Sequence, residues 1–242
     1  MKSMNDLSPN NISKEILGLT DSHISYFKQP ETNHTVGVHH SMLENFQALV
    51  ACAKKEDIEI KIASGFRSFE RQLLIWNNKF SGITVINDID GKKVDVNTLD
   101  DGEIVKAILV YSALPGASRH HWGCDIDIYA DNLLAGKPLR LEPWEYSQTG
   151  PMAKLTTWLT HNAVNYGFYF PYDIFRGGIA PEPWHLSYAP LARKFQPQLE
   201  LVILQDYLSK IDIAGKAAIT NNLSEIFSRY INNVCNAPQG FN

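Results

Sequence analysis

The sequence predicts an α+β fold with a helical C-terminal part. Segments with the apolar spacing of helices are mixed with short segments that alternate like strands. The two kinds of segment do not alternate strictly, as they would in a doubly wound parallel sheet. A chain of 242 residues with 44% hydrophobic and 20% charged residues suits one domain, or one domain with an added helical piece.

The first third of the chain contains two helix patterns around one strand pattern. Residues 1–36 are polar, and we expect them to be weakly ordered or to lie as a strap over the surface. Apolar residues recur at helical spacing from Ser41 to Lys55. Isoleucines then alternate with charged residues over 58–62, which predicts a half-buried strand. A second helix is predicted from Phe69 to Asn78.

The middle of the chain contains a hairpin, a helix and a strand. Residues 80–97 are predicted to form a loop or hairpin around Asp90-Gly91. Thr98 with Asp101 resembles a capping box that opens a helix. Pro115-Gly116 ends that helix. Over 125–129, isoleucines then alternate with polar residues, which predicts a strand with one apolar and one polar face.

The last part begins with a helix and two short strands. Pro151 starts the helix, and Gly167 is its expected C-terminal stop. Residues 168–170 and 184–188 are predicted strands. From about 191 to 237 the apolar residues again follow a helical stripe, which predicts a helical end of the chain.

Charge and terminal composition exclude several function classes. The formal net charge is −4, so the basic footprint of a nucleic-acid-binding protein is missing. The N-terminus lacks the apolar core of a secretory signal, and no run of about twenty apolar residues predicts a membrane span. We therefore expect a monomer in the cytoplasm, or in the periplasm if the N-terminus has been trimmed.

The stretch 118–127 is the richest in chemistry, with two histidines and two aspartates in ten positions. Imidazole nitrogen and carboxylate oxygen are both good Zn²⁺ ligands. A loop histidine and a strand carboxylate can converge on one ion, because Gly123 allows a sharp turn. The two aspartates share a strand face, and a second carboxylate near such an ion more often orients a histidine than binds the metal. Spacing leaves open the choice between His120 and His121 and between Asp125 and Asp127.

A second motif is Glu182-Pro-Trp-His185. A glutamate beside a metal-binding histidine can take a proton from a water molecule at the ion. Pro183 disfavours a helix here, so the motif differs from the helical His-Glu-x-x-His arrangement. We expect a loop that enters a strand and carries Glu182 to the side of His185.

A third motif places Arg67 directly after a predicted strand and before a helix. A rigidly placed arginine suits a substrate carboxylate or the oxyanion of a tetrahedral intermediate. Gln72, five residues later, could reach the same cleft. Each motif alone is weak, but together they supply ligands, a base and an electrophilic helper. No comparable motif surrounds the other histidines, and we interpret them as exposed or capping residues: His23, His34, His39, His40 and His161.

These residues carry a resemblance to a known family. Ser-x-His-x-x-Gly-x-x-x-Asp, then Glu-x-Trp-His, with Ser-Gly-Phe-Arg-Ser and a glutamine upstream, resembles the VanY-type D-alanyl-D-alanine carboxypeptidases. These belong to the zinc peptidase group M15, with the VanX-like dipeptidases and the hedgehog signalling domain. The resemblance extends through the run 114–123, through Arg71-Gln72 with 75–77, and through 184–190, within residues 38–192.

The resemblance implies a role for each matched position and a more specific form of the fold. It implies a small antiparallel sheet with flanking helices, as in hedgehog and the D,D-peptidases. Glu182 becomes the general base, and Arg67 faces the scissile carbonyl. Gln72 and Ser118 are expected to bind the terminal carboxylate of the substrate, and Tyr169 is expected to line the site without a motif that fixes it. The implied zinc ligands are His120, Asp127 and His185.

The sequence as a whole then predicts a zinc carboxypeptidase that removes the last residue of peptidoglycan-derived peptides ending in D-Ala-D-Ala. Related alternatives are an L,D-carboxypeptidase, a D,D-dipeptidase or an L-Ala-D-Glu endopeptidase acting on wall fragments. An alternative of another class is a zinc-stabilised binding domain without catalysis, which would need neither Glu182 nor Arg67. The predicted organisation is a polar segment (1–36), a zinc peptidase domain (37–192) and a helical extension packed on that domain (193–242).

Overall fold

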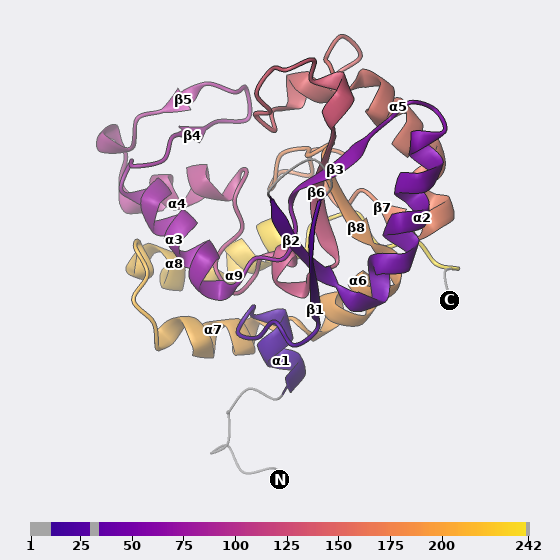
Figure 1. Cartoon of the computed structure of the whole chain (residues 1–242). Coiled ribbons are helices and arrows are strands. Elements are labelled where there is room, and N and C mark those ends of the chain that lie inside the picture. Colours follow the sequence, from indigo (N-terminus) through magenta and orange to yellow (C-terminus); the bar gives the residue numbers. More distant parts are fainter. Residues whose placement is uncertain (1–10, 30–33, 241–242) are drawn as a thin grey trace.

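The structure is a computed structural model that describes residues 11–29 and 34–240. Its central element is a four-stranded sheet in the order β3–β6–β8–β7, in which each neighbouring pair is antiparallel (Figure 1). The predicted α+β class with a small antiparallel sheet is thereby confirmed. The strands of this sheet are β3 (Ile60–Ser64), β6 (Asp125–Ala130), β7 (Phe168–Tyr169) and β8 (His185–Tyr188).

Helices flank the sheet, with α2 and α5 on one side and α3, α4 and α8 on the other in the view of Figure 1. Two antiparallel strand pairs accompany it, β1 (Ile24–Lys28) with β2 (Thr35–His39) and β4 (Ile86–Asn87) with β5 (Lys93–Val94). The helices are α1 (Asn11–Ile16), α2 (Leu43–Lys54), α3 (Phe69–Phe80), α4 (Asp101–Leu109), α5 (Ala153–Asn162), α6 (Ala189–Phe195), α7 (Leu201–Ser209), α8 (Lys216–Asn221) and α9 (Leu223–Ile226).

One hydrophobic core joins the N-terminal, central and C-terminal parts of the described chain. It includes Leu17 after α1, the isoleucines of the sheet and Ile219 of α8. The indole Nε1 of Trp76 on α3 donates to the carbonyl oxygen of Ala214 at 3.0 Å, which ties the C-terminal helices to α3. None of the helices in residues 11–29 and 34–240 is long and apolar enough to cross a bilayer.

Residues 11–29 were predicted to be weakly ordered or to lie as a strap over the surface, but they are ordered and partly buried. They form α1 and β1, and Ile16 and Leu17 are fully buried, because a few apolar side chains in a polar segment suffice to anchor it. The side-chain amide of Gln29 also pairs with the backbone N–H and carbonyl of Ile62 on β3, at 2.6 and 2.7 Å. Residues 1–10 and 30–33 of the same prediction lie outside the described residues.

The start of α4 is a second correction. The predicted capping pair Thr98 and Asp101 is wrong, and the capping box uses Asp100 and Glu103 instead. The Asp100 carboxylate accepts from the Glu103 N–H at 2.9 Å, and the Glu103 carboxylate accepts from the Asp100 N–H at 3.0 Å. Thr98 belongs to the preceding 3-10 turn, so the predicted pair was two residues out of register.

Candidate active site

The register of two neighbouring strands brings the first two candidate metal ligands together. Asp127 on β6 lies directly opposite His185 on β8, and Asp125 lies opposite Ser187. Residues paired in this way across an antiparallel ladder have Cβ atoms about 5 Å apart on one face of the sheet. The antiparallel pairing therefore juxtaposes residues that are 58 positions apart in the printed sequence.

His120 reaches the same point from the 3-10 turn Arg119–Trp122, which precedes β6. Gly123 ends this turn in the left-handed conformation (φ 69°), so the sharp turn predicted at this glycine is confirmed. His120 Nδ1 lies 2.9 Å from the carbonyl oxygen of Gly65 and must donate its proton there. A Cβ at position 65 would come 2.3 Å from the Gly37 carbonyl oxygen, so the close packing of these two backbone segments requires glycine at position 65. The arrangement leaves His120 Nε2 with a free lone pair, 3.4 Å from Asp127 Oδ2.

The side chains of His120, Asp127 and His185 form a candidate metal centre. Each offers one ligand atom, and these atoms all lie within 4.8 Å of one another. His185 Nδ1 and Asp127 Oδ1 are buried and make no hydrogen bond with any described residue, although they are only 3.2 Å apart. Buried polar atoms without partners are costly, and a cation between them would satisfy both. Two imidazoles and a carboxylate suit Zn²⁺, and three protein ligands leave an open position as in catalytic zinc sites.

The charges around the centre also favour a cation. Burial alone would lower the pKa of His185, but its contacts with Asp125, Asp127 and Glu182 outweigh burial and raise that pKa well above its ordinary value. Burial lowers the pKa of His120 to about 4, so this imidazole is neutral and able to bind a metal at neutral pH. Burial raises the pKa of Glu182, whose Oε2 lies 3.3 Å from His185 Nδ1.

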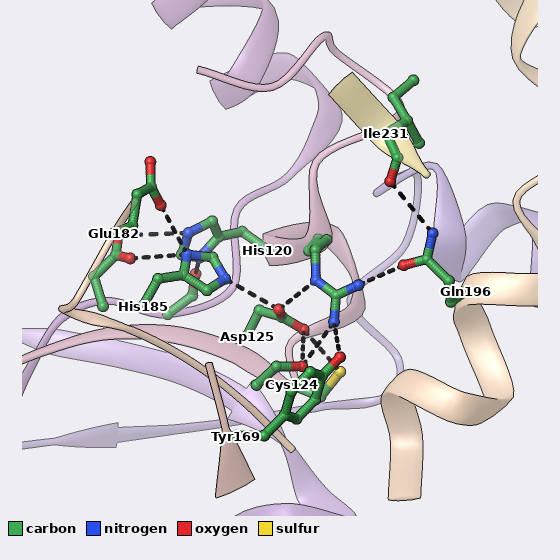
Figure 2. Close-up of polar contacts among 12 residues, drawn as sticks. His120, Cys124, Asp125, Tyr169, Glu182, His185, Gln196 and Ile231 are labelled. Atoms are coloured by element: carbon green, nitrogen blue, oxygen red, sulfur yellow. Dashed lines mark hydrogen bonds and ion pairs between the residues drawn. The ribbon is translucent and has the colours of Figure 1, made fainter. Parts of the chain in front are cut away.

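Asp125 lies between His185 and Arg119 and contacts both, as Figure 2 shows. Its Oδ1 accepts from His185 Nε2 at 3.0 Å and from Arg119 Nε at 2.7 Å. Its Oδ2 accepts from Ser187 Oγ at 3.0 Å and from the Cys124 thiol at 3.2 Å. Burial opposes the ionised form, but Arg119 and His185 together outweigh it and lower the pKa of Asp125 to about 2. Asp125 thus orients His185 while Asp127 faces the centre.

Arg119 extends this network to the C-terminal part of the chain. Its guanidinium also donates to Ser187 Oγ at 2.8 Å, to Tyr169 Oη at 2.9 Å and to Gln196 Oε1. The Gln196 amide in turn donates to the carbonyl oxygen of Ile231 at 3.4 Å (Figure 2). No sequence motif pointed to Gln196, and Arg119 stood in the recognised run without an assigned role.

Two residues predicted to line the site lie behind it instead. Tyr169 does not border the cleft, because its hydroxyl is turned toward Arg119 in the network below His185. Gln72 is completely buried, and its side-chain oxygen accepts from Arg67 Nη1 at 2.7 Å while its amide donates to the Ala113 carbonyl at 2.7 Å. Helical spacing correctly predicted that Gln72 lies near the cleft. It could not show that Arg67 lies between Gln72 and the cleft.

Arg67 itself reaches the cleft together with Glu182, the candidate ligands and Ser118. Its other terminal nitrogen donates to Ser64 Oγ at 3.0 Å, so the guanidinium is held from two sides. The cleft has a volume of about 680 Å³. One wall consists of α3 and the segment Tyr111–Ala113, and the β4–β5 hairpin and the segment Arg140–Trp144 form its rim. Lys79 and Tyr172 also border it, and neither was predicted as a site residue.

The remaining histidines are not metal ligands in this arrangement. His121 is fully buried and points away from the centre, since its Nδ1 lies 2.6 Å from the Arg67 carbonyl and its Nε2 accepts from the Gly116 N–H at 3.1 Å. His23 is buried rather than exposed or capping, because its ring packs edge-on against Phe66. His39 is also buried and caps the turn after β2 by accepting from the Ser41 N–H at 3.1 Å. The predicted exposure of His34, His40 and His161 is confirmed.

Replacing Gln72 by methionine tests the buried support of Arg67. The substitution keeps the side-chain volume but leaves Arg67 Nη1 and the Ala113 carbonyl without their partners. We expect the free energy of unfolding to fall by about 1–3 kcal/mol, the cost of unsatisfied buried groups. Chemical denaturation measures it. Gln148→Met, at an exposed position, is the matched control and should change stability little; an equal loss in both variants would contradict the role of Gln72.

Comparisons with known proteins identify the family of the chain. The sequence model of the VanY family, described as D-alanyl-D-alanine carboxypeptidase, matches residues 35–191. An uncharacterized protein of Haemophilus influenzae is 37% identical over 121 residues, which cover 49% of this chain and 92% of that protein. A D-alanyl-D-alanine carboxypeptidase of Enterococcus faecalis is 25% identical over 67% of this chain and 52% of its own length, so the chain spans about half of that protein. A solved D,D-pentapeptidase VanY variant in complex with Zn(II) is 21% identical, with a TM-score of 0.48 over 70% of this chain and 81% of that chain.

Proposed function

Since the chain belongs to the VanY family of carboxypeptidases, we propose that it is a zinc enzyme that hydrolyses the C-terminal peptide bond of peptidoglycan-type peptides ending in D-Ala-D-Ala. The observation that carries the proposal is the candidate metal centre at the floor of an open cleft, with a buried carboxylate beside it. A purely structural zinc site would be closed by a fourth protein ligand and would need no such carboxylate.

His120, Asp127 and His185 would hold the zinc ion, because their ligand atoms converge and two of them are buried without a hydrogen bond. When bound, zinc lowers the pKa of a water molecule and polarises a carbonyl group. Asp125 and the Gly65 carbonyl orient the two imidazoles, and this fixes which ring nitrogen of each faces the centre.

Glu182 is positioned to move the protons of the reaction. Its carboxylate lies next to His185 at the centre. Burial raises the pKa of Glu182, and a raised pKa suits a group that first accepts a proton and later returns it. Glu182 takes a proton from the attacking water and then gives it to the amine that leaves. Arg67, held by Gln72 and Ser64, faces the carbonyl oxygen and stabilises the negative charge that develops there.

Product analysis tests the proposed substrate. The zinc-loaded protein is incubated with muropeptides of penta-, tetra- and tripeptide length, and the products are identified by mass. We expect loss of a single D-Ala from the pentapeptide only. Cleavage of the tetrapeptide alone would instead establish an L,D-carboxypeptidase, and hydrolysis of free D-Ala-D-Ala, added as a further substrate, with no cleavage of the muropeptides would establish a D,D-dipeptidase. Absence of any cleavage would favour the non-catalytic zinc domain.

Removal of the metal tests the proposed cofactor. We expect dialysis against a chelator to abolish hydrolysis and one equivalent of Zn²⁺ to restore it. Mass spectrometry of the native protein should find one zinc per chain in the wild type and a strongly reduced zinc content in His120→Ala, because one of three ligands is lost. His121→Ala is the neighbouring control and should keep the metal, since its ring points away. Metal-free protein that is fully active would contradict the proposal.

A further inference from the structure

Lys79 places a positive charge on the cleft wall, and none of the carboxylates in residues 11–29 and 34–240 forms an ion pair with it. The residue lies near the end of α3 and borders the cleft, as does Ser112. Its Nζ donates to the Ser112 hydroxyl at 2.6 Å. Within the described residues this neutral hydroxyl is its only hydrogen-bond partner, and no carboxylate forms an ion pair with it.

An ammonium group in this position is costly for the protein alone. Burial lowers the pKa of Lys79, Glu182 opposes that change and Arg67 adds to it, so the amine lies within electrostatic range of both catalytic groups. A half-buried charge with one neutral partner has lost hydration without gaining an ion pair. Such a group is satisfied when an anion enters the cleft.

The position of Lys79 relative to Arg67 indicates which part of a peptide this anion belongs to. Gln72, which holds Arg67, and Lys79 lie on the same face of α3, two helical turns and about 10 Å apart. Peptide residues advance about 3.5 Å each along an extended chain. If the substrate runs from Arg67 toward the end of α3, a scissile carbonyl that faces Arg67 places the group one residue further along within reach of the Lys79 side chain.

We propose that Lys79 and Ser112 form the subsite that binds the terminal carboxylate of the substrate. The inference rests on the proposed carboxypeptidase function and assigns the carboxylate to residues that no motif identified. It also replaces Gln72, which was expected in this role but is buried behind Arg67. Ser118 borders the cleft but is neutral, so Lys79 supplies the charge that distinguishes a free chain end from an internal peptide bond.

The test compares an acetylated peptide ending in D-Ala-D-Ala with its C-terminal amide. The zinc-loaded wild type should prefer the acid, and Lys79→Met should reduce the acid-to-amide ratio of kcat/KM by about 10- to 100-fold, mainly through KM. Lys79→Arg should retain part of the preference, since it keeps a cation on the same wall. Lys106→Met, at an exposed position of α4, is the matched control and should leave the ratio unchanged. If Lys79→Met fails to fold, as shown by thermal unfolding, Lys79→Gln takes its place.

Calorimetric binding of the same two peptides separates this inference from the proposed function. The measurement uses zinc-loaded Glu182→Gln protein, with and without Lys79→Met, so that no turnover is needed. Loss of the acid preference with Lys79→Met supports the subsite even if the wild type proves to cleave neither peptide. An acid preference that survives Lys79→Met, or a protein that binds acid and amide equally, overturns it.

Discussion

Glu182→Gln is expected to lower kcat by about 10²- to 10⁴-fold, the usual contribution of a positioned general base, while the protein keeps its metal. Glutamine has the same shape as the carboxylate but cannot accept a proton from water. The candidate ligands do not include Glu182, so the substitution leaves the metal centre intact. It also leaves KM nearly unchanged, because the carboxylate acts on the water and on the leaving amine.

Steady-state kinetics on the pentapeptide and metal content by mass spectrometry check this expectation together. Glu142→Gln is the matched control, because Glu142 borders the same cleft and does not belong to the metal centre. It should change kcat by no more than a few-fold. A Glu182→Gln enzyme with near-normal kcat would remove Glu182 from the mechanism. A variant that loses its metal along with its activity would assign it a structural role.

Local sequence patterns were sufficient for most of the fold, because periodicity reports which side of a segment is buried. The helices α2 and α3, the β4–β5 hairpin and the end of the α5 region at Gly167 all lie within a few residues of their predicted places. The alternating pattern correctly predicted the strand β6, but it did not show that both faces of this strand are buried. There the polar face of the strand packs under the metal centre and not against solvent.

Motifs predicted the candidate site residues, but the sequence alone could not show how the strands pair and so bring Asp127 opposite His185. Spacing could not separate His120 from His121, because both rings are buried and only their hydrogen-bond partners differ: the Gly65 carbonyl for one, the Arg67 carbonyl for the other. These partners lie more than fifty residues away along the chain. Lys79 was not predicted as a site residue either, because a single lysine on an amphipathic helix usually faces solvent.

Arg119→Met is expected to lower the free energy of unfolding by about 3–5 kcal/mol, the cost of leaving one member of a buried ion pair without its partner. Arg119 and Asp125 are both buried, and the Asp125 carboxylate keeps its low pKa mainly through Arg119. The same substitution removes the donor that Tyr169, Ser187 and Gln196 share. Chemical denaturation of the metal-free protein measures the loss. Arg176→Met, which breaks the more exposed pair with Asp173, should change stability little.

A second readout separates the effect on stability from the effect on the metal centre. Because Asp125 orients His185, we expect Arg119→Met also to weaken zinc binding by about 10- to 100-fold, as measured by competition with a chelator. The double variant Arg119→Met with Asp125→Leu removes the isolated charge, so much of the stability should return. Zinc affinity should stay low in this variant, since His185 Nε2 then has no acceptor. Recovery of zinc affinity together with stability would show that the buried pair supports the fold alone and does not orient His185.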